Sequence, residues 1–431
     1  MSDMQRPNYR SALVVVTTIF FMWGFITCLN DILIPHLKAV FSLNYTQTML
    51  IQFTFFGAYF IMSLPMGKVL TKVGYKNAIS LGLLIAAVGA VMFYPAARAP
   101  SYPLFLTALF VLASGVTMLQ VAANPYVSLL GSDDSASSRL NLAQAFNSLG
   151  TTLAPYFGGM LILGATVLGA SELADMSSAD RVAYKVQQAQ SVQLPYLLLA
   201  AILAILAIVI YLWKLPNFKD QARDDSPTDN VTAAEALRHP HVLFGVIGIF
   251  AYVGAEVSIG SFLINYISLP DIGNMSESSA ASYVAYYWGG AMIGRFIGSA
   301  LMQKIRPSLM LGVFAIVAAL LTVATMLTSG HIAMWSIVAI GLFNSIMFPT
   351  IFTLGIAKLG PLTSKASSLL IMAIVGGAIL PVAQGMIADS VGIHHAFVLP
   401  LICYLFIAFY GFRGSRVINP HPASESEAQT V

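Results

Sequence analysis

Long apolar segments alternate with short polar ones along almost the whole chain. Twelve of the apolar segments approach or exceed the roughly 20 residues that an α-helix needs to cross the hydrocarbon core of a bilayer. They lie at 11–34, 47–70, 77–97, 103–130, 141–168, 194–213, 241–266, 280–303, 308–328, 332–357, 366–388 and 396–413. This pattern predicts an all-α polytopic membrane protein with twelve transmembrane helices.

Composition and charge placement agree with this interpretation. The chain is 58% hydrophobic and only 9% charged, whereas a soluble domain is usually about 25% charged. Seventeen of the 21 lysines and arginines fall on one side of the predicted membrane, and only Lys38, Arg98, Arg181 and Lys185 fall on the other. Because cytoplasmic loops are enriched in positive charge, we expect both termini to be cytoplasmic.

A polar segment at 214–240 divides the twelve helices into six and six. We therefore expect a six-helix bundle at 1–213, a cytoplasmic linker at 214–240, a second six-helix bundle at 241–418 and a disordered cytoplasmic tail at 419–431. The halves also repeat each other: Gly150, Pro155, Gly159 and Met160 recur 226 residues later, and a shift of 224 sets Gln120 opposite Asn344. Two parallel six-helix halves are typical of the major facilitator fold, which holds its substrate near the midplane between them.

Two carboxylates stand deep in apolar segments, Asp31 near the end of the first and Glu256 in the middle of the seventh. Such acids are expensive in a bilayer, so they are normally paired, protonatable or exposed to water along a transport pathway. Desolvation disfavours the charged form of an unpaired buried carboxylate, which suits a group that takes up and releases protons. We favour proton coupling for both; a helix cap or ion pair at Asp31, and a structural pair between Glu256 and Arg295, are the alternatives.

Amide side chains recur on the helical faces of several predicted spans. Amides are costly against lipid, so these faces must look toward protein or water. For any single amide, a hydrogen bond between helices explains its presence as well as contact with a ligand does. Gln144 and Asn147 match Leu370 and Ala373 in the second half, an asymmetry that favours a polar cavity binding a polyhydroxylated ligand. The candidate substrate-binding residues are Asn30, Gln120, Asn124, Gln144, Asn147, Glu256 and Asn344.

Other chemistries are not indicated by the sequence. The seven histidines lie in loops, helix ends or the tail, and the chain carries no phosphate-binding loop and no nucleophile motif. We therefore expect no catalytic activity, no metal site, no cofactor and no nucleic-acid partner, and we expect a monomer in the lipid bilayer. With no ATP-hydrolysing part in the sequence, accumulation of a solute must come from an ion gradient.

Four stretches carry a resemblance to a known family. They are Leu29-Asn30-Asp31-Ile32-Leu33-Ile34-Pro35, Ala122-Ala123-Asn124-Pro125-Tyr126, the segment from Arg139 to Ser148, and the segment from Phe348 to Ile356. Through these the chain resembles the fucose–glucose–galactose proton symporters of the major facilitator superfamily over nearly its whole length. The resemblance implies a twelve-helix sugar transporter.

The resemblance also implies roles for single positions. In the fucose branch of the family, the aspartate matching Asp31 and a glutamate on the fourth helix are linked to proton coupling and sugar recognition. This chain keeps the first acid but has Gln120 at the second, and Glu256 stands where the fucose branch has a glutamine. These departures resemble the glucose/galactose branch.

The sequence thus predicts a secondary active transporter of the bacterial inner membrane that imports a hexose of the glucose/galactose type by proton symport with alternating access. The alternatives are a carrier of fucose or another small polar solute, or coupling to sodium. A sugar sensor that binds without transporting is a further alternative, although the chain has no long signalling domain.

Overall fold

The computed structural model describes the backbone of residues 9–41, 45–98, 101–162, 192–213 and 232–418, and a few single residues between 176 and 216. Within these ranges, side chains at 9–10, 28–41, 45–49, 155–162, 277–278 and 281 lie outside the description. The side chains of Asn30 and Asp31, the tail at 419–431 and most of the linker at 214–240 therefore lie outside the described residues, and the domain boundaries stay a prediction.

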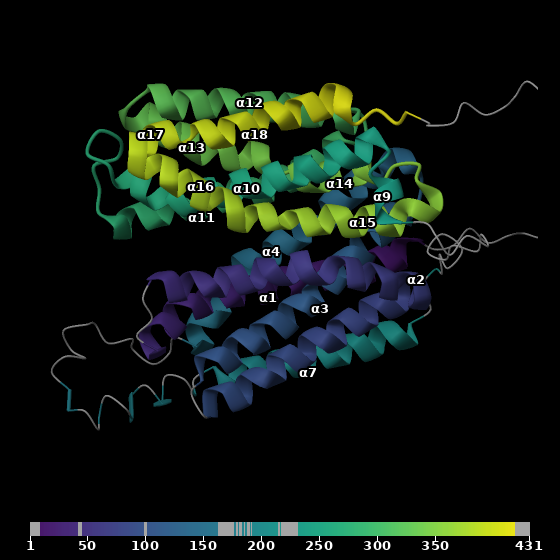
Figure 1. Cartoon of the computed structure of the whole chain (residues 1–431), viewed down its shortest axis with the longest axis horizontal. Helices are drawn as coiled ribbons and strands as arrows, with labels where there is room; N and C mark the ends of the chain where they lie inside the picture. The colour runs from purple at the N-terminus through teal and green to yellow at the C-terminus, as the bar shows by residue number, and fades with distance from the viewer. Residues whose placement is uncertain are drawn as a thin grey trace, which may run out of the picture.

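Helices of the first part of the chain lie together in the lower part of Figure 1, and those of the second part lie above them. The lower group comprises α1 (Tyr9–Phe41), α2 (Tyr45–Arg98), α3 (Tyr102–Leu129), η1 (Asp133–Ser135), α4 (Ala136–Ile162) and α7 (Gln193–Leu212). The upper group, preceded by α9 (Ala233–Ala236), comprises α10 (Pro240–Ser268), α11 (Glu277–Leu301), α12 (Pro307–Leu327), α13 (Gly330–Asn344), α14 (Met347–Gly355), η2 (Gly360–Leu362), α15 (Thr363–Met372), η3 (Ala373–Val375), α16 (Gly376–Val391), α17 (Ile393–Ala396), α18 (Val398–Phe409) and η4 (Tyr410–Gly414). Below they are called the N-terminal half and the C-terminal half.

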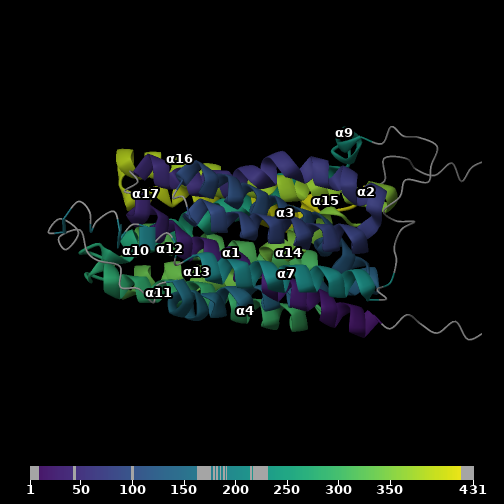
Figure 2. The ribbon, with the colours of Figure 1, turned by 90° about the horizontal axis from the view of Figure 1, so that it is seen from below.

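The long helices run along one common direction (Figures 1 and 2), as membrane-spanning helices must. α2 contains 54 residues, about 80 Å of helix at 1.5 Å per residue, which is more than twice the thickness of a hydrocarbon core. It is broken at Gly74, whose φ of 79° is readily adopted only by glycine. α2 therefore supplies two of the predicted spans, 47–70 and 77–97.

Three predicted spans are built from shorter pieces. The span 332–357 is divided between α13 and α14, the span 366–388 between α15, η3 and α16, and the span 396–413 between α17, α18 and η4. With these divisions, the all-α architecture of twelve spanning helices is confirmed.

Close packing within the N-terminal half depends on small residues. A Cβ added at Gly115 of α3 would collide with the backbone of α2 near Gly82 and Ala86, and one at Gly24 of α1 would collide with Asn147 of α4. Small residues at such contacts let helix backbones approach closely, which is how helices gain packing energy where the surrounding lipid is as apolar as they are. These close contacts fix where α1, α3 and α4 lie relative to their neighbours. The polar side chains that these helices carry are positioned as a result.

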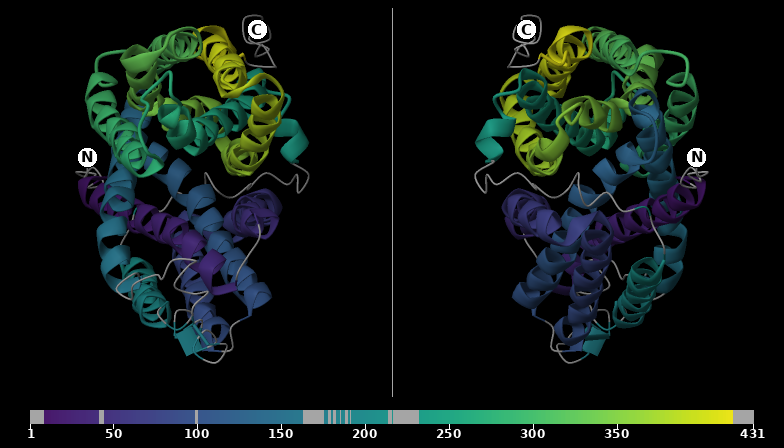
Figure 3. Two further views of the ribbon diagram at one scale, coloured as in Figure 1. Left: turned by 90° about the vertical axis from the view of Figure 1, so that its left-hand side faces the viewer. Right: turned by 90° about the vertical axis from the view of Figure 1, so that its right-hand side faces the viewer.

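Buried hydroxyl groups join the two halves. Ser137 contacts Thr353 at 2.6 Å, Ser138 donates to the carbonyl of Ser299 at 2.7 Å, and Ser367 donates to the carbonyl of Val121 at 3.0 Å. Ser137 and Ser138 open α4, while Thr353 and Ser299 close α14 and α11, so these contacts gather toward one end of the bundle. The views along the helices show the halves side by side (Figure 3), and α1 begins and η4 ends at one common end (Figure 1).

Candidate functional site

The two halves contain matching pairs of an amide and a tyrosine. In the N-terminal half, Nε2 of Gln120 on α3 donates to the hydroxyl of Tyr59 on α2 at 2.8 Å. In the C-terminal half, Nδ2 of Asn344 at the end of α13 donates to the hydroxyl of Tyr287 on α11, also at 2.8 Å. These amides are the ones that the internal repeat sets opposite each other, and each tyrosine comes from the second span of its half.

Each of these amides keeps an oxygen without a partner. Gln120 is 5% exposed and Asn344 is fully buried, yet neither Oε1 of Gln120 nor Oδ1 of Asn344 accepts a hydrogen bond within the described part of the chain. An unsatisfied buried acceptor costs about 1–3 kcal/mol, so two repeat-related acceptors call for a functional explanation. A ligand that carries several hydroxyl donors would satisfy both.

The other amides of the N-terminal half divide into two kinds. Gln144 of α4 donates to Oδ1 of Asn124 on α3 at 3.4 Å, and both side chains are buried. Nδ2 of Asn124 has no hydrogen-bond partner among the described atoms. Asn147 instead donates to the backbone carbonyl of Phe20 on α1 at 3.0 Å. Asn147 thus holds α4 against α1, the glue alternative for this residue, whereas Asn124 and Gln144 form a buried amide pair with spare hydrogen-bonding capacity.

Proline positions in the fourth and tenth spans release backbone carbonyls for other partners. A proline lacks the N–H that would bond the carbonyl four residues earlier. Pro125 thereby releases the carbonyl of Val121, which accepts from Ser367 of the opposite half. Pro349 releases the carbonyl of Ser345, where α13 gives way to α14, and this carbonyl accepts from Nε of Arg295 at 3.1 Å.

Arg295 of α11 uses its three guanidinium nitrogens in three directions. Nε bonds the carbonyl of Ser345, Nη1 donates to the hydroxyl of Ser148 on α4, and Nη2 lies 3.9 Å from Oε1 of Glu256 on α10. The side chains of Arg295 and Glu256 are each 13% exposed. The guanidinium therefore contacts both the break between α13 and α14 and the carboxylate of Glu256. Through Ser148 it also contacts the N-terminal half.

Glu256 is surrounded by hydroxyl groups as well as by this cation. Tyr252, one turn earlier on α10, donates to Oε1 of Glu256 at 2.7 Å. The hydroxyl of Tyr287 donates to the backbone carbonyl of Glu256 at 3.4 Å, which links the acid to the Asn344 pair. Glu256 is therefore not unpaired: Arg295 reaches its carboxylate, and the pair that the sequence offered as an alternative is present. The proton-coupling role of Glu256 stays a prediction.

The structure thus assembles two groups of candidate residues: Gln120, Asn124 and Gln144 in the N-terminal half, and Glu256 and Asn344 in the C-terminal half. Tyr59, Tyr252 and the three-way role of Arg295 were not predicted from the sequence. Pro349 was the sequence signal that could have identified the role of Arg295. A proline leaves the carbonyl four residues earlier without its helical partner, so another donor can bind it.

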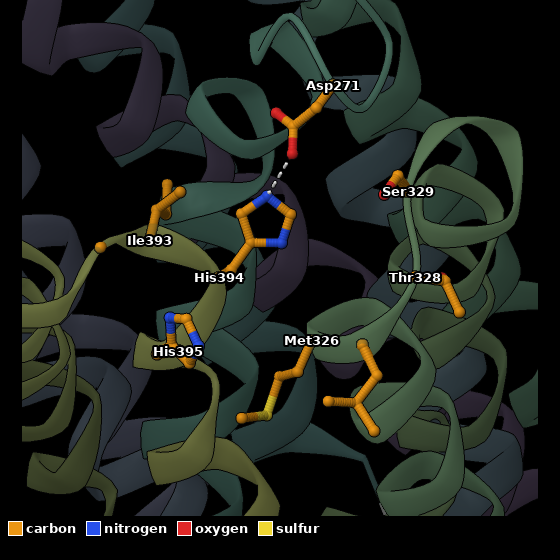
Figure 4. A pocket seen from close by; sticks show the side chains of 9 residues that line it. Asp271, Met326, Thr328, Ser329, Ile393, His394 and His395 are labelled. Atoms are coloured by element: carbon orange, nitrogen blue, oxygen red, sulfur yellow. Dashed lines mark ion pairs between the residues drawn. The ribbon is translucent and has the colours of Figure 1, made fainter.

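A separate pocket lies at the other end of the C-terminal half (Figure 4). It is lined by Asp271 after α10, by the end of α12 with the residues that follow it, and by α17 with Gly392 before it. Nε2 of His394 lies 3.1 Å from Oδ2 of Asp271 there. None of the candidate site residues lines it, so it plays no part in the site described above.

Comparison with known proteins agrees with this architecture. Residues 13–373 match the family model of the Major Facilitator Superfamily. The chain belongs to this superfamily. It is therefore a multi-pass membrane transporter.

Relatives place the chain more finely within the superfamily. A glucose/galactose transporter of Brucella abortus is 56% identical over 411 residues, which are 95% of this chain and 96% of the relative. The L-fucose-proton symporter of Escherichia coli is 36% identical over 420 residues, 96% of each chain. A crystal structure of FucP in the outward conformation matches with a TM-score of 0.89 and 35% identity, covering 95% of this chain and all of that one.

These findings confirm the predicted membership of the fucose–glucose–galactose symporter family, nearest to its glucose/galactose branch. Because these relatives are transporters, they also confirm that the chain is not an enzyme.

Proposed function

We propose that this chain imports a hexose of the glucose/galactose type together with a proton across the inner membrane of a bacterium. The identity of the relatives supports the substrate class, since glucose/galactose transporters are more similar to the chain than the L-fucose-proton symporter is. The presence of an acid–cation pair inside the spans supports coupling to an ion gradient.

The observation that carries the proposal is the pair of unpartnered amide oxygens on Gln120 and Asn344. A hexose presents hydroxyl donors around its ring, and one bound between the halves can donate to an acceptor on each side. The amides of Asn124 and Gln144 add further capacity on the N-terminal side. A site built to hydrogen-bond hydroxyls discriminates strongly against analogues that lack them.

In this proposal, Asp31 and Glu256 are the proton-coupling residues. Asp31 lies on α1, where its side chain is outside the described residues, and Asn30 beside it stays a candidate sugar contact. The backbone carbonyl of Glu256 accepts a hydrogen bond from Tyr287, whose hydroxyl accepts one from Asn344, so the acid and a candidate sugar contact lie close together on neighbouring helices. Proton and sugar are then linked thermodynamically, each changing the affinity for the other by the same factor.

The hydroxyl contacts near the start of α4 keep the halves together at one end of the bundle. With the charge distribution of the loops, we assign that end and both termini to the cytoplasm. Alternating access then requires Ser137, Ser138 and Ser367 to part from Thr353, Ser299 and Val121 when the transporter opens inward.

Uptake by purified protein in proteoliposomes tests the function. A panel of labelled sugars is offered under a pH gradient and, separately, under a sodium gradient. We expect glucose and galactose to accumulate with the pH gradient and not with sodium. Accumulation of fucose alone, a candidate favoured by the 36% identical L-fucose-proton symporter, or accumulation driven only by sodium, would contradict the proposal.

A further inference from the structure

Contacts between α4 and α11 form a continuous seam between the two halves. Ser138 meets Ser299, Phe146 meets Phe296 with ring centroids 6.0 Å apart, Ser148 meets Arg295, and Thr152 meets the sulfur of Met292 at 3.5 Å. The first, second and fourth of these contacts are between neutral side chains. Arg295 brings a full positive charge into an otherwise neutral set of contacts.

That charge is balanced from within the C-terminal half. Glu256 is the carboxylate beside the guanidinium, at 3.9 Å. The other titratable groups that interact with Glu256 are Tyr252 of α10, Tyr287 of α11 and Tyr404 of α18. Among the described side chains, none of these groups comes from α13, α14, α15 or α16, so Arg295 is the cation that a change of charge on Glu256 affects first.

We propose that Arg295 transmits the charge state of Glu256 to the N-terminal half through its hydrogen bond to Ser148. This positioning role rests on the proposed proton symport and extends it, because it specifies how a proton in one half alters the contact with the other. Proton binding converts the carboxylate of Glu256 to a neutral carboxylic acid, while the guanidinium keeps its charge.

Loss of the carboxylate charge changes what holds Arg295 in place. Its remaining partners are then the carbonyl of Ser345 and the hydroxyl of Ser148, both neutral, and a buried cation without a counter-charge is strongly disfavoured. Arrangements of the halves that hydrate the guanidinium become more favourable, and these require it to leave Ser148. The planar fork of arginine is needed for this, since a lysine offers one ammonium and cannot hold three partners in fixed directions.

Two serines of the same seam give a matched test. Ser148→Ala removes the hydroxyl that Arg295 contacts, whereas Ser138→Ala removes a hydroxyl that bonds Ser299 and does not touch Arg295. Sugar binding is measured at a low and a high pH in detergent, and sugar-dependent proton uptake is followed in lightly buffered proteoliposomes. Arg295→Lys is included because it keeps the charge.

We expect both Ser148→Ala and Arg295→Lys to bind sugar. Each should reduce the ratio of the dissociation constants at high and low pH by about tenfold, the lower end of what a hydrogen bond to a charged group contributes. Both should take up fewer protons per sugar, and Ser138→Ala should retain the wild-type ratio and proton uptake. Equal behaviour of the two serine variants, whether both unchanged or both impaired, would overturn the role of Arg295. Absence of sugar-dependent proton uptake by the wild type would instead overturn proton symport itself.

Discussion

The ion pair between Glu256 and Arg295 can be tested by replacing each residue with glutamine, singly and together. At 3.9 Å, two unit charges attract by about 4 kcal/mol if the effective dielectric constant is about 20. Because each side chain keeps 13% of its surface exposed, we expect roughly half of that, about 2 kcal/mol, as a coupling energy. Glu256→Gln alone leaves Arg295 without a counter-charge and should be the least stable of the three variants.

Denaturant titration in detergent micelles gives the free energy of unfolding for the wild type, both single variants and the double variant. The double variant should be more stable than the sum of the single losses predicts, because it leaves neither charge buried alone. Tyr252→Phe is the control: it removes the 2.7 Å hydrogen bond to Oε1 of Glu256 without changing any charge, and should cost about 1.5–3 kcal/mol. Additive losses for the Glu256 and Arg295 replacements would show that the two side chains do not interact, and would refute the electrostatic argument.

Further predictions concern the remaining candidates and the packing. Asp31→Asn should abolish sugar accumulation in a pH gradient, since an amide cannot cycle a proton, while exchange of labelled for unlabelled sugar continues; wild-type accumulation would contradict its coupling role. Gln144→Leu should weaken sugar binding by about 0.5–1.5 kcal/mol in calorimetry, and unchanged affinity would make this amide structural. Asn147→Ala should instead lower the free energy of unfolding by about 1 kcal/mol with little change in affinity, which a denaturant titration checks. Gly115→Ala should lower the thermal unfolding midpoint because its Cβ meets the α2 backbone, whereas Gly57→Ala, which meets nothing within 4 Å, should not.

The number and approximate positions of the spanning segments followed from hydropathy, because only a bilayer requires so many apolar runs of this length. The turn at Gly74 inside α2 was also within reach, since the two predicted spans on either side of it together exceed one membrane thickness. The internal repeat predicted that Gln120 and Asn344 occupy matching places. That each amide bonds a tyrosine was not predictable from the repeat. The offset between Tyr59 and Tyr287 differs from the offset between the two amides.

Arg295 illustrates where one-dimensional reasoning fails. If residues are counted along each helix, Arg295 is expected to lie nearer the cytoplasm than Glu256. This expectation assumes that the helix ends lie at the same depth and that side chains are short. Arginine has a long side chain, and the carbonyl of Ser345 that Pro349 releases draws it toward the break between α13 and α14. Distances between helices decide such contacts, and a single sequence without related sequences carries little information about them.

The placement of charge gives the proposed symport a physical direction. Where the resemblance leads one to expect an acid on the fourth span, this chain has Gln120 bonded to Tyr59, and its repeat mate Asn344 bonded to Tyr287, so both repeated positions are neutral. The charges stand instead at Glu256 and Arg295, which sum to zero when the acid is ionised and to one positive charge when it is protonated.

A protonated Glu256 leaves the guanidinium of Arg295 without a counter-charge, and the oxygens of a polyhydroxylated sugar can accept hydrogen bonds from it. In the proposed mechanism, sugar bound beside Asn344 therefore offsets part of the cost of protonating Glu256, and the proton in turn favours sugar. Positive linkage of this kind drives symport, whereas a sugar that competed with the proton would give exchange. Sugar affinity should accordingly rise as pH falls through the range in which Glu256 titrates, and Glu256→Gln should remove that dependence. An affinity that falls on acidification would reverse the sign of the linkage and exclude this arrangement of charges as the coupling device.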